Sequence, residues 1–453
     1  MRRAFIPTVI LIFAGLLPLA AQQSKKLVAP TPPMGWNSWD CFGLTVDEKD
    51  FRANAEWLAK HLKSSGWQYV VVDEGWFLPH PEVGPKPGRE VVLDSDSRYI
   101  PATNRYPSAE GDKGFKPLAD YVHSLGLKFG LHIVRGIPRE AVAKNQPIAG
   151  SSFRAADVAD TSDTCPWDHD NFGVRDNAAG QAFYDSVARL YAGWGVDFVK
   201  VDCISSHPYK GAEIRMLSNA IAKSGRPMVL SLSPGPTSVA VAEEVVKYSQ
   251  MWRISDDFWD YWTTSPRDSW TQTLHGQIAT AAAWAPYIGN GHWPDADMLP
   301  IGYLGPHPGL GEARQTRFTH DEQRTLITFW SIIRSPLIIG GNLPRSDEWT
   351  TALLTNPEVL AVNQHSKNNR PVLTTNSLVV WTAAPEDGKG LYVAVVNRGD
   401  GKLGVNLGWD EVGLEAGQSY NVRDLWEHKD LGVANGFKAE LPPHASALLR
   451  ISK

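Results

Sequence analysis

Apolar, β-branched stretches alternate with stretches of helical periodicity up to about residue 340, and this alternation constrains the fold most. Nearly continuous apolar runs are typical of parallel strands that are buried on both faces. The predicted strands are residues 67–73, 128–134, 197–202, 228–233 and 337–340, and the predicted helices are residues 48–63, 115–124, 177–194, 209–224 and 321–333. More than six such units over about 310 residues, with no glycine-rich phosphate loop after the first strand, favour a (β/α)8 barrel over an open doubly wound sheet.

The C-terminal part of the sequence has a different pattern, which begins near Asn369. Short apolar pieces such as residues 391–396 and 405–407 alternate with Gly, Asn and Asp, and helical periodicity stops. This pattern is typical of a small antiparallel β-sandwich. We therefore predict an α/β protein with a (β/α)8 TIM barrel at residues 26–367 and a C-terminal antiparallel β-sandwich domain at residues 368–453.

The N-terminus has the layout of a secretory signal, with two arginines, an apolar stretch and small residues before a polar segment. We predict a signal peptide at residues 1–21, because Pro7 and Pro18 argue against a stable membrane span. The mature chain is then expected to be secreted or periplasmic, without membrane contact. A formal net charge of −5 gives no sign of a nucleic-acid or anionic-membrane partner.

Acidic residues gather where four of the predicted strands end, and barrel enzymes carry their chemistry at that rim. The four groups are Asp73 with Glu74, Asp202, Asp256 with Asp257, and Asp295 with Asp297. Carboxylates accept hydrogen bonds from sugar hydroxyls, and some of the 18 tryptophans can stack on sugar faces, although core packing also explains many of them. Two of the carboxylates can also serve as nucleophile and acid/base across a glycosidic bond.

Other interpretations of these acids are weaker. Ion pairs on the rim are common at single strand ends, but they do not explain four such ends with aromatic neighbours. A metal site needs closely spaced oxygen ligands or clusters of His and Cys, and a serine hydrolase needs a G-x-S-x-G elbow; neither pattern occurs. We therefore predict no metal and no cofactor.

Six short motifs occur in order along nearly the whole mature chain. They are PPMGWNSWDCFG at 32–43, VVVDEGW at 70–76, KVDC at 200–203, RISDD at 253–257, WPDADML at 293–299 and NPEVLAVNQ at 356–364. With these motifs the sequence resembles glycoside hydrolase family 27 of clan D, the α-galactosidase and α-N-acetylgalactosaminidase group.

The resemblance implies a retaining exo-glycosidase with Asp202 as the nucleophile and Asp257 as the acid/base. Asp256 is expected to point the other way along its strand and to be structural. The implied substrate-binding residues are Trp36 as a stacking floor, Asp73, Glu74, His132, Lys200, Ser233, Arg253 and Asp297. The family also pairs the cysteine after the nucleophile with one on the preceding loop, which implies a Cys165–Cys203 disulfide and a free Cys41.

Two departures from the family bear on the sugar. Glu74 stands where the family has a second aspartate, and its extra methylene reaches toward the place of the galactose C6 group. Ser233 is small where the family carries a larger contact, which leaves room for a bulkier 2-substituent. The expected substrate is a galactoside or related carbohydrate with a terminal α-D-galactosyl residue. The alternatives are a β-L-arabinopyranosidase, an α-N-acetylgalactosaminidase and, remotely, a non-catalytic sugar-binding protein, which is expected to have lost Asp202 or Asp257.

Overall fold

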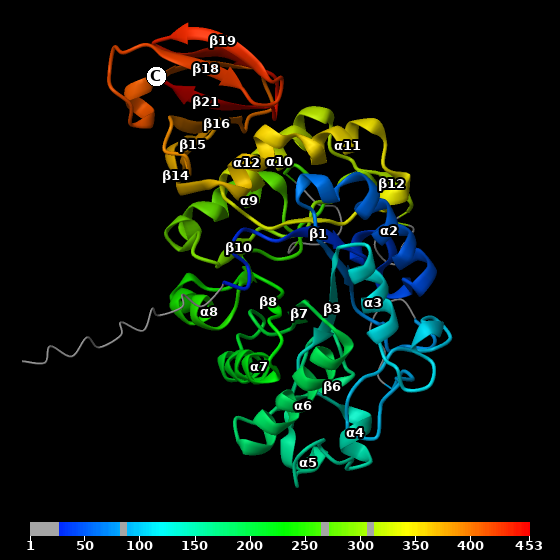
Figure 1. Ribbon diagram of the computed structural model, residues 1–453. Coiled ribbons are helices and arrows are strands. Elements are labelled where there is room, and N and C mark those ends of the chain that lie inside the picture. The colour runs from blue at the N-terminus through cyan, green and yellow to red at the C-terminus, as the bar shows by residue number, and fades with distance from the viewer. Residues whose placement is uncertain (1–26, 82–87, 264–270, 306–311) are drawn as a thin grey trace, which may run out of the picture.

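The structure is a computed structural model that describes residues 27–81, 88–263, 271–305 and 312–453 (Figure 1). The predicted signal peptide lies outside these residues. Eight parallel strands form one sheet in the order β10-β9-β8-β7-β3-β2-β1-β13. Their bounds are β1 Met34–Asn37, β2 Tyr69–Val72, β3 Lys128–Val134, β7 Phe198–Asp202, β8 Val229–Leu232, β9 Met251–Arg253, β10 Trp293–Asp295 and β13 Leu337–Ile339.

The sheet closes into a barrel just beyond β10. Leu299 donates its backbone N–H to the carbonyl of Ile338 at 2.7 Å, and Gly340 donates to the carbonyl of Leu299 at 3.0 Å. Chain order and ring order agree around the ring, so Asp202 ends the fourth barrel strand and Arg253 ends the sixth. The predicted TIM barrel is confirmed.

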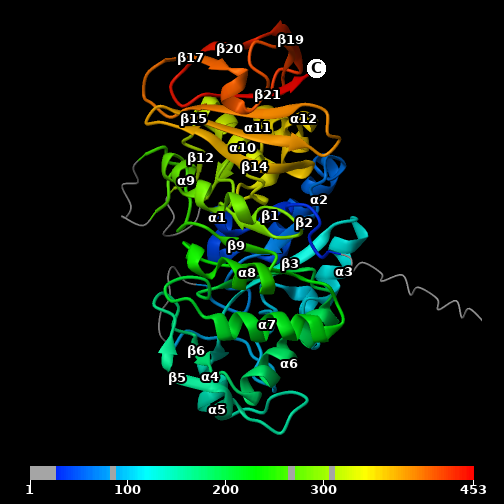
Figure 2. The same ribbon diagram turned by 90° about the vertical axis from the view of Figure 1, so that its left-hand side faces the viewer.

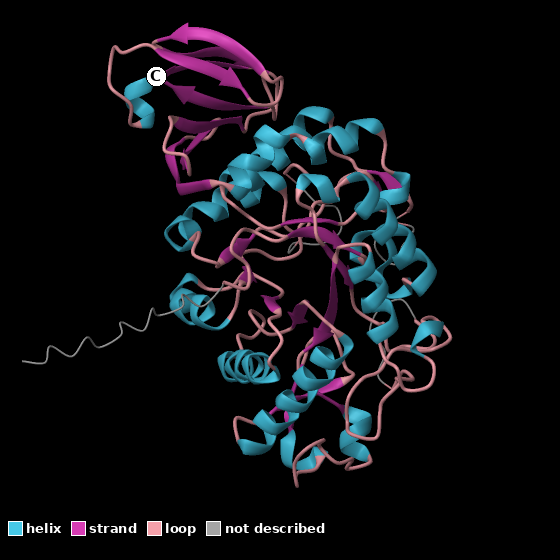
Figure 3. Cartoon of the chain, viewed as in Figure 1, coloured by secondary structure: helices cyan, strands magenta, loops and turns pink. Residues whose placement is uncertain are grey.

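Helices surround the barrel strands (Figure 3). Side-chain caps fix several helix starts: Asp47 accepts from the third helical residue of α2, and Asn177 does the same for α6. The main helices are α2 Glu48–His61, α3 Lys116–Ser124, α6 Ala178–Trp194, α7 Gly211–Ser224, α8 Ala242–Tyr248, α9 Leu274–Thr280, α10 His320–Ile332, α11 Glu348–Thr355 and α12 Pro357–Gln364. Short helices are α1 Trp39–Phe42, α4 Arg139–Ala143 and α5 Ala155–Val158.

A small antiparallel sheet is inserted between β3 and α6, and it carries one wall of the barrel mouth. Its strands are β4 Ile137–Pro138, β5 Ala159–Thr164 and β6 Asn171–Val174, in the order β4-β6-β5. The loop between β5 and β6, residues 165–170, starts at Cys165. A further two-stranded ribbon pairs β11 Tyr303–Leu304 with β12 Arg314–Gln315.

The C-terminal part packs two antiparallel sheets face to face (Figure 2). The larger sheet has the order β14-β15-β16-β21-β18-β19, and the smaller pairs β17 with β20. Valines from the larger sheet, such as Val393, and residues of the smaller one, such as Val405 and Phe437, share one buried core. The strands are β14 Ser366–Thr374, β15 Leu378–Pro385, β16 Leu391–Asn397, β17 Leu403–Gly408, β18 Tyr420–Asp424, β19 Lys429–Ala434, β20 Gly436–Leu441 and β21 Ser446–Ser452. The predicted β-sandwich is confirmed.

Candidate active site

The charged end of β7 lies in the barrel mouth. Lys200 and Asp202 are two residues apart on one strand, so both side chains point to the same face. The Lys200 Nζ atom lies 3.0 Å from the Asp73 carboxylate, which also accepts from the Asn37 amide at 2.7 Å. Burial raises the pKa of Asp73, but the charges of Lys200 and His132 and the hydrogen bonds to its carboxylate together outweigh burial, and the pKa is lowered. Lys200 is therefore a charged donor that is paired with Asp73.

The carboxylate of Asp202 accepts a hydrogen bond from the Nε1 atom of Trp167 at 2.9 Å. Trp167 lies in the loop between β5 and β6, and this loop is tied to the strand end by a disulfide between Cys165 and Cys203. The cysteine pairing implied by the family is therefore present. Cys41 is free and buried, as expected.

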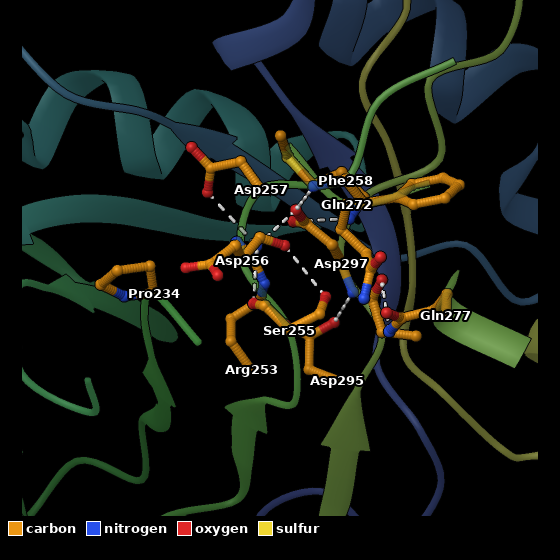
Figure 4. Close-up of polar contacts among 12 residues, drawn as sticks. Pro234, Arg253, Ser255, Asp256, Asp257, Phe258, Gln272, Gln277, Asp295 and Asp297 are labelled. Atoms are coloured by element: carbon orange, nitrogen blue, oxygen red, sulfur yellow. Dashed lines mark hydrogen bonds and ion pairs between the residues drawn. The ribbon is translucent and has the colours of Figure 1, made fainter. Parts of the chain in front are cut away.

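The predicted acid/base lies in the loop that follows β9. Arg253, the last residue of β9, contacts the Asp297 carboxylate at 2.6 Å and the Asp257 carboxylate at 3.3 Å (Figure 4). The side chain of Asp257 is 44% exposed, whereas that of Asp297 is 7% exposed. Asp257 is thus open to substrate and water, while Asp297 is committed to holding Arg253. One barrel strand, β8, separates β7, which ends at Asp202, from β9, whose following loop carries Asp257.

The expectation that strand alternation turns Asp256 away from the site does not apply. The strand β9 ends at Arg253, so strand alternation does not reach Asp256. Its carboxylate instead lies 3.0 Å from the Nε2 atom of the half-exposed His207. This contact is consistent with a structural role for Asp256.

The expectation that Trp36 forms a stacking floor is wrong. Trp36 is fully buried, and its Nε1 atom donates to the carbonyl of Gly341 at 2.8 Å. Alternation along β1 explains this, because Asn37 lines the barrel mouth and its neighbour must point out toward the helices. There the Trp36 ring packs against Phe51 of α2. The partly exposed Trp39, just after β1, is the tryptophan of this segment with surface to offer a ligand.

Glu74 is held at the edge of the site by a buried arginine. The Arg89 guanidinium lies 3.5 Å from Glu74, 2.7 Å from Asp168 and 2.6 Å from Asp170. Burial, followed by the charge of Asp168, raises the pKa of Glu74 well above its usual value, although Arg89 opposes the shift. Glu74 is therefore poised to donate as well as accept hydrogen bonds.

His132 and Ser233 complete the set of predicted residues. His132 is paired in register with Lys200, so both face the barrel mouth, and its buried Nδ1 atom has no hydrogen-bond partner among the described residues. Burial lowers the pKa of His132 and favours its neutral form. Ser233 lines a pocket of about 330 Å³ of unfilled space, including the part open to solvent. The polar lining of this pocket is Asn37, Lys200, Ser231, Ser233, Arg253, Asp295 and Asp297.

The residues predicted from the sequence do not include Asn37, Arg89 and Trp167, which also belong to this site. Alternation along the first strand was a signal for Asn37, but the other two come from loops whose contacts are not local. In the part of the chain that the structure describes, no group of three or more His, Cys, Asp or Glu side chains is arranged to hold a metal ion. Within the same residues, no helix is long and apolar enough to cross a membrane.

Comparisons with known proteins show which sequences and structures the chain resembles. The family model of alpha galactosidase A matches residues 171–365, and that of the alpha galactosidase C-terminal beta sandwich domain matches residues 375–451. An alpha-galactosidase of Coffea arabica is 31% identical over 425 residues, covering 92% of this chain and 93% of the relative. An alpha-galactosidase of Cyamopsis tetragonoloba is 30% identical and covers 92% and 84%, respectively.

A solved structure, the family 27 β-L-arabinopyranosidase of Geobacillus stearothermophilus, is 47% identical with a TM-score of 0.90 and covers 94% of this chain and 97% of its own. Alpha-galactosidase I of Mortierella vinacea has the same fold, with a TM-score of 0.71 at 24% identity, covering 93% and 97%. The fold and these relatives define a glycoside hydrolase. The chain belongs to glycoside hydrolase family 27, the α-galactosidase family.

Proposed function

We propose that the chain is a retaining exo-glycosidase that removes terminal β-L-arabinopyranosyl residues. The carrying observation is Glu74, a partly buried residue, 14% exposed at its side chain, that Arg89 fixes beside the Lys200–Asp73 pair. β-L-Arabinopyranose shares the ring configuration of α-D-galactose but lacks C6, so it suits a site whose wall is advanced by one methylene. The 47% identity to the Geobacillus β-L-arabinopyranosidase also supports this substrate over the α-D-galactosyl substrate that was expected from the motifs.

In the proposed reaction, Asp202 attacks the anomeric carbon while Asp257 protonates the leaving oxygen as the glycosidic bond breaks. Asp257 then deprotonates a water molecule, which displaces Asp202 and releases the sugar with its configuration retained. Two such displacements need carboxyl groups about 5–5.5 Å apart. The side chains proposed to bind or frame the ring hydroxyls are those of Lys200, Asp73, His132, Arg253, Ser233 and Asp297.

The disulfide between Cys165 and Cys203 supports the proposal that the protein is exported, since such bridges persist in oxidising compartments.

A screen of aryl glycosides tests the sugar. The substrates are matched aryl glycosides of β-L-arabinopyranose, α-D-galactose and α-N-acetylgalactosamine. We expect kcat/KM to be highest on the arabinopyranoside and measurable on the galactoside, because the two sugars differ only at C6. A kcat/KM that is highest on the galactoside contradicts the proposal and indicates an α-galactosidase. A kcat/KM that is highest on the N-acetylgalactosaminide indicates an α-N-acetylgalactosaminidase whose 2-substituent fits beside Ser233.

Glu74→Asp is expected to move this preference. Shortening the side chain by one methylene opens the C6 position, so kcat/KM on the galactoside should rise relative to the arabinopyranoside by roughly 5-fold or more, since a methylene's fit is worth about 1–3 kcal/mol. Glu74→Gln is the matched control, because it keeps the length and should keep the preference. An unchanged ratio in Glu74→Asp means that Glu74 does not face the C6 position.

A further inference from the structure

The carboxylate of Asp202 is oriented by the loop opposite it. Within the described residues, the Asp202 carboxylate accepts one hydrogen bond, from the Trp167 Nε1 atom to Oδ2 at 2.9 Å. An indole N–H can only donate, and a bond to a carboxylate is charge-assisted. With Oδ2 held in this way, Oδ1 is the oxygen left to attack a substrate.

The disulfide in turn holds Trp167. Cys165 lies two residues before Trp167, and Cys203 directly follows Asp202. The Trp167 ring also packs on the buried cluster of Val134 and the two cysteines. The bridge is therefore both a covalent tether and part of the surface on which the indole rests.

The backbone of Asp202 has supports that do not depend on the bridge. Asp202 pairs with Val134 of β3, and the preceding Val201 pairs with Leu232 of β8. The Asp202 carbonyl also accepts from the Arg135 backbone N–H at 3.1 Å. The Arg135 Nε atom also donates to the carbonyl of Cys203 at 2.7 Å, where the chain turns with a φ of 60°. Loss of the bridge should therefore loosen the Trp167 loop while the strand end stays in place.

We propose that Trp167 is a positioning residue for the nucleophile and that the Cys165–Cys203 disulfide acts on catalysis through Trp167. This inference rests on the proposed role of Asp202. The far side of the loop is held by Arg89, which binds Asp168 and Asp170. The loss of the bridge should therefore have a smaller effect than the loss of the indole N–H.

The test removes the N–H while keeping the ring. Replacement of Trp167 by 3-benzothienylalanine, an isostere without the N–H, and Trp167→Phe should both lower kcat by roughly 10- to 100-fold, the range for a hydrogen bond to a charged group. Trp426→Phe is the matched control, because Trp426 is also partly exposed and its Nε1 atom donates to Thr328 at 2.8 Å, far along the chain from the site. Wild-type kcat in the benzothienyl variant overturns the proposal, since packing alone then explains Trp167.

A double-mutant cycle tests the bridge. Cys165→Ala/Cys203→Ala should lower kcat about 3- to 10-fold in the parent but less than 2-fold in Trp167→Phe, because residues that act through one contact are not additive. An equal loss in both backgrounds contradicts action through Trp167. If the double variant fails to fold by circular dichroism, the benzothienyl variant still decides the role of Trp167.

Labelling separates this inference from the proposed function. An activated 2-deoxy-2,2-difluoro glycoside should trap the sugar on Asp202 in the parent enzyme, as seen by peptide mass spectrometry. Both Trp167 variants should be trapped at the same residue but more slowly. Label on another residue in the parent enzyme refutes the proposed nucleophile, whereas label on Asp202 at equal rates in all variants refutes only the role of Trp167.

Discussion

Asp202→Ala is expected to abolish turnover on every glycoside, with kcat falling by roughly 10⁴-fold or more, as when a nucleophile that forms a covalent intermediate is removed. The carboxylate ends β7 in the barrel mouth, and Trp167 and the adjacent disulfide fix its surroundings. With a methyl group in its place, no glycosyl-enzyme can form, even from a substrate with an excellent leaving group. The measurement is kcat on activated aryl glycosides.

External azide provides the control for this variant. Azide can enter the space that the carboxylate leaves and attack the anomeric carbon directly, so the product should be a glycosyl azide of the opposite configuration. A protein that was merely misfolded cannot be rescued in this way. Activity within tenfold of the parent enzyme, with the same product anomer, contradicts a nucleophilic Asp202.

Asp257→Ala should separate substrates by their leaving groups. Proton transfer by a positioned side chain contributes roughly 10²- to 10⁴-fold, and only poor leaving groups need that proton. We expect a loss in that range on natural-type glycosides and a far smaller loss of the first step on dinitrophenyl glycosides, measured as kcat/KM. The exposed carboxylate of Asp257 suits this exchange of protons with water.

Asp256→Ala is the matched control, since it removes the neighbouring carboxylate without touching Arg253. It should keep kcat/KM within a few-fold on both kinds of substrate, because Asp256 contacts His207 at the rim. Two outcomes contradict Asp257 as the acid/base. One is an equal loss on good and poor leaving groups in Asp257→Ala, and the other is a loss confined to poor leaving groups in Asp256→Ala.

The barrel was predictable because its central strands are long apolar runs. β3 has the bounds predicted for it, residues 128–134, and Lys200 and Asp202 stand at the end of β7 as expected. The sandwich strands β19 and β20 were missed. β19 is exposed along nearly its whole length and is interrupted by Gly432, so it has neither an apolar run nor alternation.

The site was predictable where strand position determines it and not where loops do. Asp73, His132, Lys200 and Arg253 follow from strand ends and from one shared inward face. Trp36 was misassigned because its role was taken from the motif alone. Side chains alternate along β1, so with Asn37 facing inward its neighbour Trp36 faces outward. The contacts of other residues cross long stretches of sequence, such as those from Arg89 to Asp168 and from Trp167 to Asp202. No local pattern encodes such pairs, because they depend on how two loops meet in the folded chain.

The central claim is double displacement through Asp202, and proton NMR of the first-formed sugar tests it most directly. The unmodified enzyme is incubated with its best aryl glycoside, and the anomeric signals are followed before mutarotation mixes them. We predict that the first product has the same anomeric configuration as the substrate. A first product of inverted configuration contradicts the account, because a single displacement by water has no use for a nucleophilic carboxylate.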